Sequence, residues 1–170
     1  MKIIAIAAVT AGGKTTAVNG IKHRLKNTQS LHFDDYSFEG AVEDFHKWVA
    51  DGADYNVWNL KPLEDDIIAI KNSGNCEYLV YCHHMINKYI DVAIFIDTPL
   101  DIALVRRILR DMSNSTGEEI REELDGYLKY SRIAYEQMLK DILPSSDYVI
   151  DGSLDANKII DELVKIIESM

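Results

Sequence analysis

Several features that would indicate a particular class of protein are scarce in this sequence. It has 2 cysteines, Cys76 and Cys82, too few and unsuitably spaced for a disulfide framework or a zinc site. Its 18 lysines and arginines are outnumbered by 28 aspartates and glutamates, and no basic stripe could neutralise a polynucleotide. No apolar run is long enough to span a bilayer, and no secretion signal begins the chain. We therefore expect a soluble, cytoplasmic protein without nucleic-acid or membrane partners.

The composition that is present fits one globular domain. The chain has 170 residues, within the usual range for a single domain, and 47% of them are hydrophobic, which is enough for one core. No internal repeat, low-complexity linker or shift in composition divides it. We expect a single domain over residues 1–170.

A short apolar run near the N-terminus leads into a glycine-rich segment. The run, Ile3–Ala8, is too short for an ordinary helix and predicts a buried strand. Residues 8–15, Ala-Val-Thr-Ala-Gly-Gly-Lys-Thr, match the phosphate-binding loop pattern G-x-x-x-x-G-K-[ST] except at the first position, Ala8. The next segment, Lys14–Lys26, has apolar residues at helical spacing. Strand, loop and helix in this order predict phosphate binding.

The residue types in this loop suit a nucleotide and its metal ion. Gly12 and Gly13 would allow successive backbone N–H groups to turn toward phosphate oxygens. Lys14 supplies a positive charge for the terminal phosphates, and the Thr15 hydroxyl can ligate Mg²⁺. The following helix aims its N-terminal partial charge at the same anion. The alternative is an ordinary glycine-rich turn in which Lys14 is a solvated surface charge.

Short apolar runs and helical segments alternate along the rest of the chain. Further strands are expected at residues 30–33, 77–82, 92–96 and 148–150, and helices at residues 40–51, 63–71, 99–112, 118–143 and 154–170. Thr98 and Ser153 are expected to cap the helices that they precede. This alternation predicts a three-layer α/β/α domain with a five-stranded parallel sheet, which binds its ligand at the carboxyl ends of the strands.

Two acidic residues, Asp34 and Asp35, follow the second expected strand and should open onto the crevice beside the loop. A carboxylate there can accept the proton of a substrate hydroxyl that attacks the γ-phosphate, or hold Mg²⁺ through water. The alternative is a simple turn, because Asp and Ser are common turn residues.

Three arginines, Arg106, Arg107 and Arg110, precede a polar segment at residues 113–117. Phosphoryl transfer needs positive charge around the migrating group, which guanidinium supplies with a bidentate fork. We interpret them as the root of a short lid over about residues 107–121. The alternative is a solvated helix face in which Arg107 pairs with Asp111.

The region between residues 38 and 61, where the second substrate should bind, has no arginine and several carboxylates. A neutral or cationic acceptor fits this composition better than a phosphorylated one. We interpret Trp48, Tyr55 and Trp58 as packing groups rather than as a base-stacking platform.

The chain resembles the uridine kinase and nicotinamide riboside kinase group of P-loop kinases, and still more a group of small bacterial uridine kinase-like ATP-binding proteins. The matching segments, in the order of the family, are Gly12–Thr16, Leu31–Tyr36, Tyr55 and Asn56, Phe95–Asp111, Tyr127–Arg132 and Ser146–Gly152. The resemblance implies transfer of the γ-phosphoryl group of ATP, with Mg²⁺, to a hydroxyl of a small-molecule acceptor, usually the 5′-hydroxyl of a riboside.

The resemblance also implies roles for individual residues. It implies catalytic roles for Lys14, Asp34, Arg107 and Arg110, with Asp34 as the base, and Mg²⁺ binding by Thr15. It implies nucleotide contacts for Ala11, Gly12, Gly13, Lys14, Thr15, Thr16, Arg106, Gly152 and Ser153. It implies acceptor contacts for Asp35, Tyr36, Tyr55 and Asn56. His83, or alternatively His84, is a further candidate for the acceptor because it follows the carboxyl end of the third expected strand. A homodimer is an assembly that the tyrosine-rich segment at residues 118–143 would allow.

Three departures from the family pattern keep a second interpretation open. The third expected strand ends Leu79-Val-Tyr-Cys82, without the acidic residue that supports the metal in uridine kinases. Asn56 stands where riboside-binding relatives have an aspartate, and residues 113–117 lack an arginine. The alternative to a kinase with a changed acceptor is therefore a vestigial or non-catalytic ATP-binding regulatory module.

Overall fold

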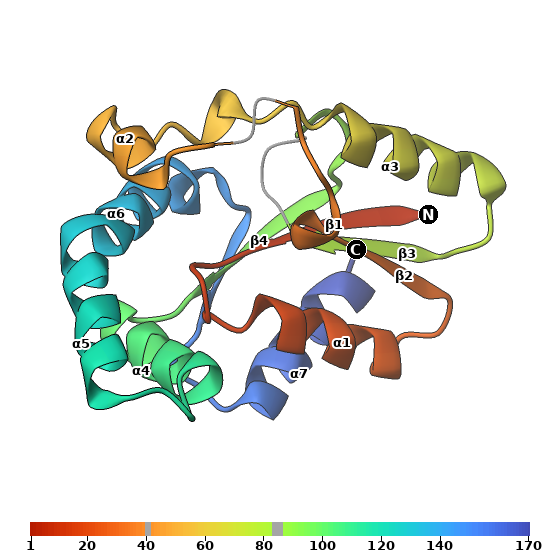
Figure 1. Ribbon diagram of the computed structural model, residues 1–170. Helices are drawn as coiled ribbons and strands as arrows, with labels where there is room; N and C mark the ends of the chain where they lie inside the picture. The colour runs from red at the N-terminus through yellow and green to blue at the C-terminus, as the bar shows by residue number, and fades with distance from the viewer. Residues whose placement is uncertain (40–41, 83–86) are drawn as a thin grey trace.

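The computed structural model describes residues 1–39, 42–82 and 87–170, and its centre is a parallel sheet (Figure 1). The strands are β1 (Lys2–Ala7), β2 (Thr28–His32), β3 (Tyr78–Cys82), β4 (Val92–Asp97) and β5 (Tyr148–Asp151). They lie in the order β2-β3-β1-β4-β5, and all neighbouring strands are parallel. The expected five-stranded parallel sheet is confirmed, and the carboxyl ends of its strands share one edge.

Helices cover both faces of this sheet. The α-helices are α1 (Lys14–Arg24), α2 (Phe45–Ala50), α3 (Lys61–Ser73), α4 (Leu100–Asp111), α5 (Gly117–Gly126), α6 (Arg132–Asp141) and α7 (Ala156–Glu168). The short helical turns are η1 (Phe33–Asp35), η2 (Tyr55–Val57), η3 (Asn87–Tyr89) and η5 (Leu143–Ser145), and a π-helical segment, η4 (Tyr127–Ser131), joins α5 to α6. Among the described residues, no helix combines the length and apolar character needed to cross a bilayer.

The alternation of side chains along β1 separates the layers. Ile4 and Ile6 pack with apolar residues of α1 and α7, whereas Ile3 and Ala5 face the opposite side, against α3. Ala7 faces this second side too, where it packs with residues of α4 and α6. Figure 1 shows α1 and α7 together on one side of the sheet and α3 on the other. The expected three-layer α/β/α fold is confirmed.

Two of the expected helices differ from the structure. The helix expected over residues 40–51 begins only at Phe45, because the Asp44 carboxylate caps it by accepting the backbone N–H of Lys47 at 3.0 Å. Residues 40–41 lie outside the described residues. The continuous helix expected over residues 118–143 is instead two α-helices with η4 between them. A π-helical segment widens the helix locally, and hydrophobic periodicity does not predict it.

Both expected caps are wrong. The helix α7 is capped by Asp155, whose carboxylate accepts the N–H groups of Asn157 and Lys158, while Ser153 lies farther upstream and bonds to Asp151. Thr98 does not cap α4, because its hydroxyl is directed elsewhere, toward the loop after β1.

Candidate functional site

A cleft of about 1050 Å³ opens beside the carboxyl end of β1. Its walls come from the loop after β1, the turn η1 after β2, the helices α2 and α4, and the segment from α5 to α6. The expected site residues that line it are Ala11, Gly13, Lys14, Thr15, Thr16, Asp34, Tyr55, Arg106, Arg107 and Arg110. Its volume is at the upper end of the usual range for small-molecule sites, so it has room for a nucleotide and a second small substrate.

The loop between β1 and α1 has only part of the backbone that the sequence pattern predicts, because the Gly12 N–H donates to the Val9 carbonyl oxygen at 2.9 Å instead of turning toward a ligand. Gly13, the residue before α1, has a φ of 101°, a left-handed conformation that strongly favours glycine. Ala11 also has a positive φ, of 59°, which is uncommon for a residue with a side chain. Ala8, the departure from the pattern, is fully buried and does not have a positive φ, so its methyl group is accommodated.

Lys14 lies over this loop from the first turn of α1. Its Nζ donates a hydrogen bond of 2.6 Å to the carbonyl oxygen of Ala8. Thr15 and Thr16 are exposed beside it and line the cleft. The ammonium group is therefore held at the loop by an uncharged carbonyl acceptor. A phosphate oxygen would be a stronger acceptor for it, because hydrogen bonds between charged groups are shorter and stronger.

The loop is fastened to the rest of the sheet by Thr98. This residue follows β4 and is only 1% exposed, and its hydroxyl donates a 2.9 Å hydrogen bond to the carbonyl oxygen of Gly12. Gly152, which follows β5, lies so close that a Cβ there would overlap the Thr98 hydroxyl. The carbonyl oxygen of Gly152 accepts a hydrogen bond of 3.1 Å from Arg106. Gly152 and Ser153 thus lie outside the cleft lining. Gly152 is connected to the cleft by its hydrogen bond with Arg106, which lines it.

Replacing Gly152 with alanine should destabilise the protein by roughly 1–3 kcal/mol, because a methyl group would displace Thr98 and loosen the loop. Gly117→Ala is the matched control, since a Cβ at that position would meet no atom within 4 Å. Urea unfolding of both variants measures the difference. Equal stability of the two would show that the space beside Thr98 is not limiting.

The arginines of α4 that line the cleft have different hydrogen-bond partners. Arg107 is bound by the carboxylate of Glu123 in α5, at 2.8 Å, and by the Tyr135 hydroxyl in α6, at 3.3 Å. The alternative pairing of Arg107 with Asp111 is wrong, because Asp111 is bound by Arg110 at 2.6 and 2.8 Å. This hydrogen bonding holds the pKa of the Asp111 carboxyl below its usual value. The positive charges expected at this wall are present.

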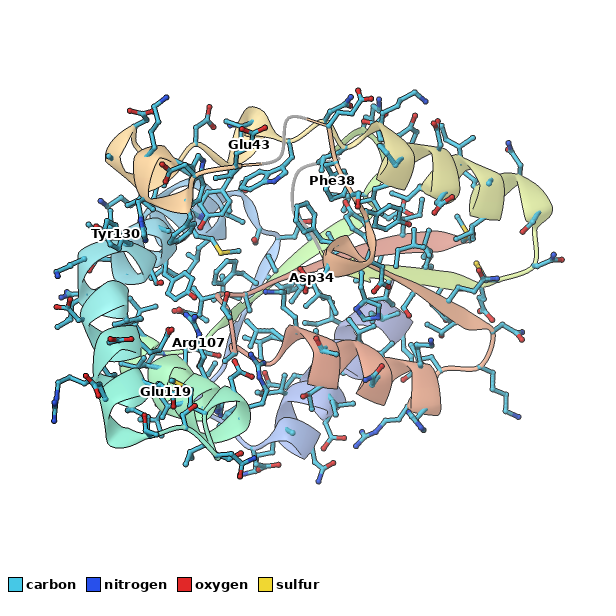
Figure 2. All side chains as sticks on the ribbon, in the orientation of Figure 1. Asp34, Phe38, Glu43, Arg107, Glu119 and Tyr130 are labelled. Carbon is cyan, nitrogen blue, oxygen red and sulfur yellow. The ribbon has the colours of Figure 1, made fainter. Side chains whose placement is uncertain are left out.

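Asp34 faces the same cleft from the opposite side. It lies in η1, directly after β2, and is exposed to solvent. Figure 2 shows Asp34 beside this turn and Arg107 on the side of the molecule formed by α4 and α5. The cleft therefore places a carboxylate and the arginine-bearing wall around one space.

The structure does not bring three of the expected acceptor contacts into this cleft. Asp35 and Tyr36 lie outside its lining, and the Tyr36 hydroxyl donates instead to Asp66 of α3, at 2.7 Å. The Asn56 side chain donates to Asp54 at 2.8 Å and lies in a separate, shallower hollow. His83 lies outside the described residues. Of the expected acceptor contacts that the structure describes, Tyr55 lines the cleft.

Aromatic side chains form one end of the cleft. The rings that line it there are Phe45, His46, Trp48, Tyr55, Trp58 and Tyr130. His46 stacks on Tyr130 with ring centroids 3.9 Å apart, and Trp48 meets Tyr55 edge to face at 5.1 Å. The interpretation of the tryptophans and Tyr55 as packing groups was therefore incomplete, because the rings pack together and also face the cleft.

The polar atoms of two of these rings already have protein partners. The Tyr55 hydroxyl donates to the carbonyl oxygen of Ala134 at 2.9 Å, and Trp48 Nε1 donates to that of Asp54 at 2.9 Å. Burial raises the pKa of the Tyr55 phenol above its usual value, so the group stays protonated and remains a donor. These rings offer the cleft their apolar surfaces.

Oxygen ligands for a magnesium ion are present in the cleft, although no preformed metal cluster is. Within residues 1–39, 42–82 and 87–170, no three His, Cys, Asp or Glu side chains are placed together to hold a metal ion. The Thr15 hydroxyl and the Asp34 carboxylate both line the cleft. Mg²⁺ usually takes one or two protein oxygens together with substrate phosphates and water, so these residues fit the ion.

Comparison with known proteins agrees with this geometry. The sequence profile of the phosphoribulokinase / uridine kinase family matches residues 77–159. A uridine kinase of Borrelia hermsii (strain HS1 / DAH) is 27% identical, over 88% of this chain and 86% of that protein. The chain is therefore similar to uridine kinases over most of its length. The match to the family profile begins after the phosphate-binding loop. The loop and the profile match are therefore independent indications of a kinase-like protein.

Solved structures share the fold of this chain. A putative fructose transport system kinase from Silicibacter sp. TM1040 superposes with a TM-score of 0.65 at 10% identity, over 87% of this chain and 88% of that one. Deoxyadenosine kinase from M. mycoides with bound dATP superposes with a TM-score of 0.56 at 17% identity, over 99% of this chain and 100% of that one. At these identities the likeness shows the fold alone.

Sequence reasoning missed several residues of this site, among them Thr98, Glu123 and Tyr130. Thr98 was expected to cap a helix, and neither Glu123 nor Tyr130 was singled out for the cleft. The sequence offers Arg107 a nearer partner, Asp111, at helical spacing, so no local signal indicates Glu123. Nor does one exist for Tyr130, whose direction depends on the π-helical segment η4.

Proposed function

We propose that this protein is an ATP-dependent kinase that transfers the γ-phosphoryl group to a hydroxyl of a nucleoside-like or other small acceptor. The observation that carries the proposal is the cleft, which brings together the phosphate-binding loop, the Asp34 carboxylate and the arginines of α4. The likeness to uridine kinases supports a small-molecule kinase. The proposal treats the whole chain as one kinase domain that acts in the cytoplasm, alone or as a homodimer.

ATP binds in this proposal with its phosphates on the loop and at the N-terminus of α1. Lys14 exchanges the Ala8 carbonyl for phosphate oxygens, and the backbone N–H groups of residues 11 and 13–16 surround the remaining phosphate oxygens, while the Gly12 N–H stays bonded to the Val9 carbonyl. Thr15 holds Mg²⁺, which neutralises part of the phosphate charge when it is bound. Arg106, Arg107 and Arg110 face the migrating group from α4. In this proposal Gly152 and Ser153 lie toward the adenine base of ATP.

Asp34 acts as the general base in this scheme. Its carboxylate accepts the proton of the acceptor hydroxyl as the hydroxyl oxygen attacks the γ-phosphorus. Its position at the carboxyl end of β2, across the cleft from α4, supports this role because the attacking oxygen must approach opposite the leaving group.

The acceptor lies against the aromatic end of the cleft. The rings there present faces, since the polar atoms of Trp48 and Tyr55 are bonded to the protein, and no lysine or arginine stands among them. A flat, uncharged or cationic acceptor stacks well on such faces. A phosphorylated acceptor would find no cation to neutralise it there.

A non-catalytic ATP-binding module is the second candidate function. The observation that favours it is the end of β3, Tyr78–Cys82, which carries no acidic residue to support the metal. Measuring ATP consumption with Mg²⁺ against a panel of nucleosides, sugars, vitamins and aminoglycoside-like alcohols separates the two functions. We expect acceptor-dependent ADP release together with a phosphorylated product detected by mass spectrometry. Tight ATP binding without product from any acceptor would favour the regulatory module.

The lid is expected to close when both substrates bind. Residues 112–116 connect α4 to α5, and Thr116 and Glu119 form a capping box at the start of α5. In hydrogen exchange, residues 106–121 should be poorly protected without ligand and better protected with an ATP analogue and acceptor together. The helix α3, none of whose residues line the cleft, serves as an internal control and should not change. Unchanged exchange across residues 106–121 at saturation would refute the lid.

A further inference from the structure

The Arg107 guanidinium is held from two sides before any substrate is bound. Its Nη2 is 2.8 Å from the carboxylate of Glu123, and its Nη1 donates to the Tyr135 hydroxyl at 3.3 Å. These partners come from α5 and α6, whereas Arg107 comes from α4, and all three side chains line the same cleft. The contact therefore joins α4, α5 and α6 at one wall of the cleft.

This ion pair differs from the others in the described part of the chain. The side chains of Arg107 and Glu123 are only 25% and 29% exposed, whereas Lys129 and Asp125, a pair within one helical turn, are each 59% exposed. Exposed pairs of that kind contribute little to stability. A partly buried pair that crosses between helices fixes both side chains, because solvent screens it less.

A carboxylate is an unfavourable group to place beside a polyphosphate. Glu123 lines a cleft whose loop and arginines are suited to an anion, and its charge would repel the phosphates of ATP. A group that weakens binding of the nucleotide needs another role in the site. Its hydrogen-bonded contact with Arg107 indicates what this role is.

We propose that Glu123, assisted by Tyr135, is a positioning residue that fixes the plane of the Arg107 guanidinium for phosphoryl transfer. This inference rests on the proposed kinase function. A guanidinium has five N–H donors in a rigid fork, and the two partners engage only part of it. The remaining N–H groups are free to contact the migrating phosphoryl group in one fixed orientation. Such preorganisation lowers the barrier without strengthening ground-state binding.

The proposal predicts opposite effects on binding and turnover. Removing the Glu123 charge should leave ATP affinity unchanged or raise it, because a repulsive carboxylate is lost. It should lower kcat by about 10- to 100-fold, because even a small misplacement of a group that contacts the reacting atoms is costly. An ion pair that served only the fold would not separate the two quantities in this way.

The experiment compares Glu123→Gln with Glu122→Gln, which makes the same charge change at the neighbouring exposed residue of α5. ATP affinity is measured by calorimetry, and kcat and KM with the acceptor found in the screen. We expect the split described above for Glu123→Gln only, with similar melting temperatures for both variants. Glu123→Asp, which keeps the charge, should recover part of the turnover. Wild-type kcat in Glu123→Gln would overturn the proposal.

A second measurement does not depend on activity. Phenylglyoxal modifies accessible guanidinium groups, and mass spectrometry follows its reaction at Arg107. We expect faster modification of Arg107 in Glu123→Gln than in the wild-type protein or Glu122→Gln. An unchanged rate would show that Glu123 does not hold Arg107, whatever the activity. A wild-type protein that phosphorylates no acceptor would instead refute the kinase function and the catalytic consequence of the contact.

Discussion

Replacing Lys14 with alanine should abolish productive binding of ATP while leaving the fold intact. The Lys14 ammonium lies at the phosphate-binding loop, where it donates a hydrogen bond to the carbonyl oxygen of Ala8. Its removal deletes the charge that bridges the terminal phosphates. A hydrogen bond to a charged group is worth about 1.5–3 kcal/mol, so affinity should fall by at least about tenfold. Calorimetric titration with ATP and Mg²⁺ measures the loss.

Lys26→Ala is the matched control for this variant. Lys26 is an exposed lysine just beyond the end of α1 and does not line the cleft, so its removal makes the same change in net charge away from the loop. Its ATP affinity should equal that of the wild-type protein. If Lys14→Ala also binds ATP with wild-type affinity, residues 8–15 are an ordinary turn and the nucleotide site is elsewhere.

Asp34→Asn should lower turnover by roughly 10²–10⁴-fold, the usual contribution of a general base, with little change in nucleotide affinity. The amide cannot accept a proton from the acceptor hydroxyl, yet it is nearly the same size as the carboxylate and also suits the turn η1. Steady-state kinetics with the identified acceptor measures turnover, and calorimetry measures ATP binding.

Asp35→Asn separates a catalytic effect from a local one. It makes the same substitution one residue farther along η1, where the carboxylate lies outside the cleft lining. Its turnover should stay close to that of the wild-type protein. Near-normal turnover in Asp34→Asn would remove Asp34 from the catalytic mechanism. A large loss of turnover in Asp35→Asn would show that Asp34 is the wrong carboxylate for the general base.

Much of the fold could be predicted because it depends on local patterns. The loop after β1 requires particular residues within one short segment, and the left-handed backbone at Gly13 is a local property of glycine. The alternation of short apolar runs with helical periodicity predicts parallel βαβ units, because each strand must reach the same edge of the sheet. The position of Asp34 follows from the same rule, since it comes directly after β2.

The sequence by itself thus determined the parallel sheet, the phosphate-binding loop and the carboxylate and arginines that face it. Only the tertiary structure decided that Thr98 bonds to Gly12, that aromatic rings from α2, η2 and η4 form one end of the cleft, and that Glu123 holds Arg107. These contacts join residues from separate elements. Their partners are set by how the helices pack on the sheet and by a π-helical segment, neither of which leaves a periodic signal in the sequence.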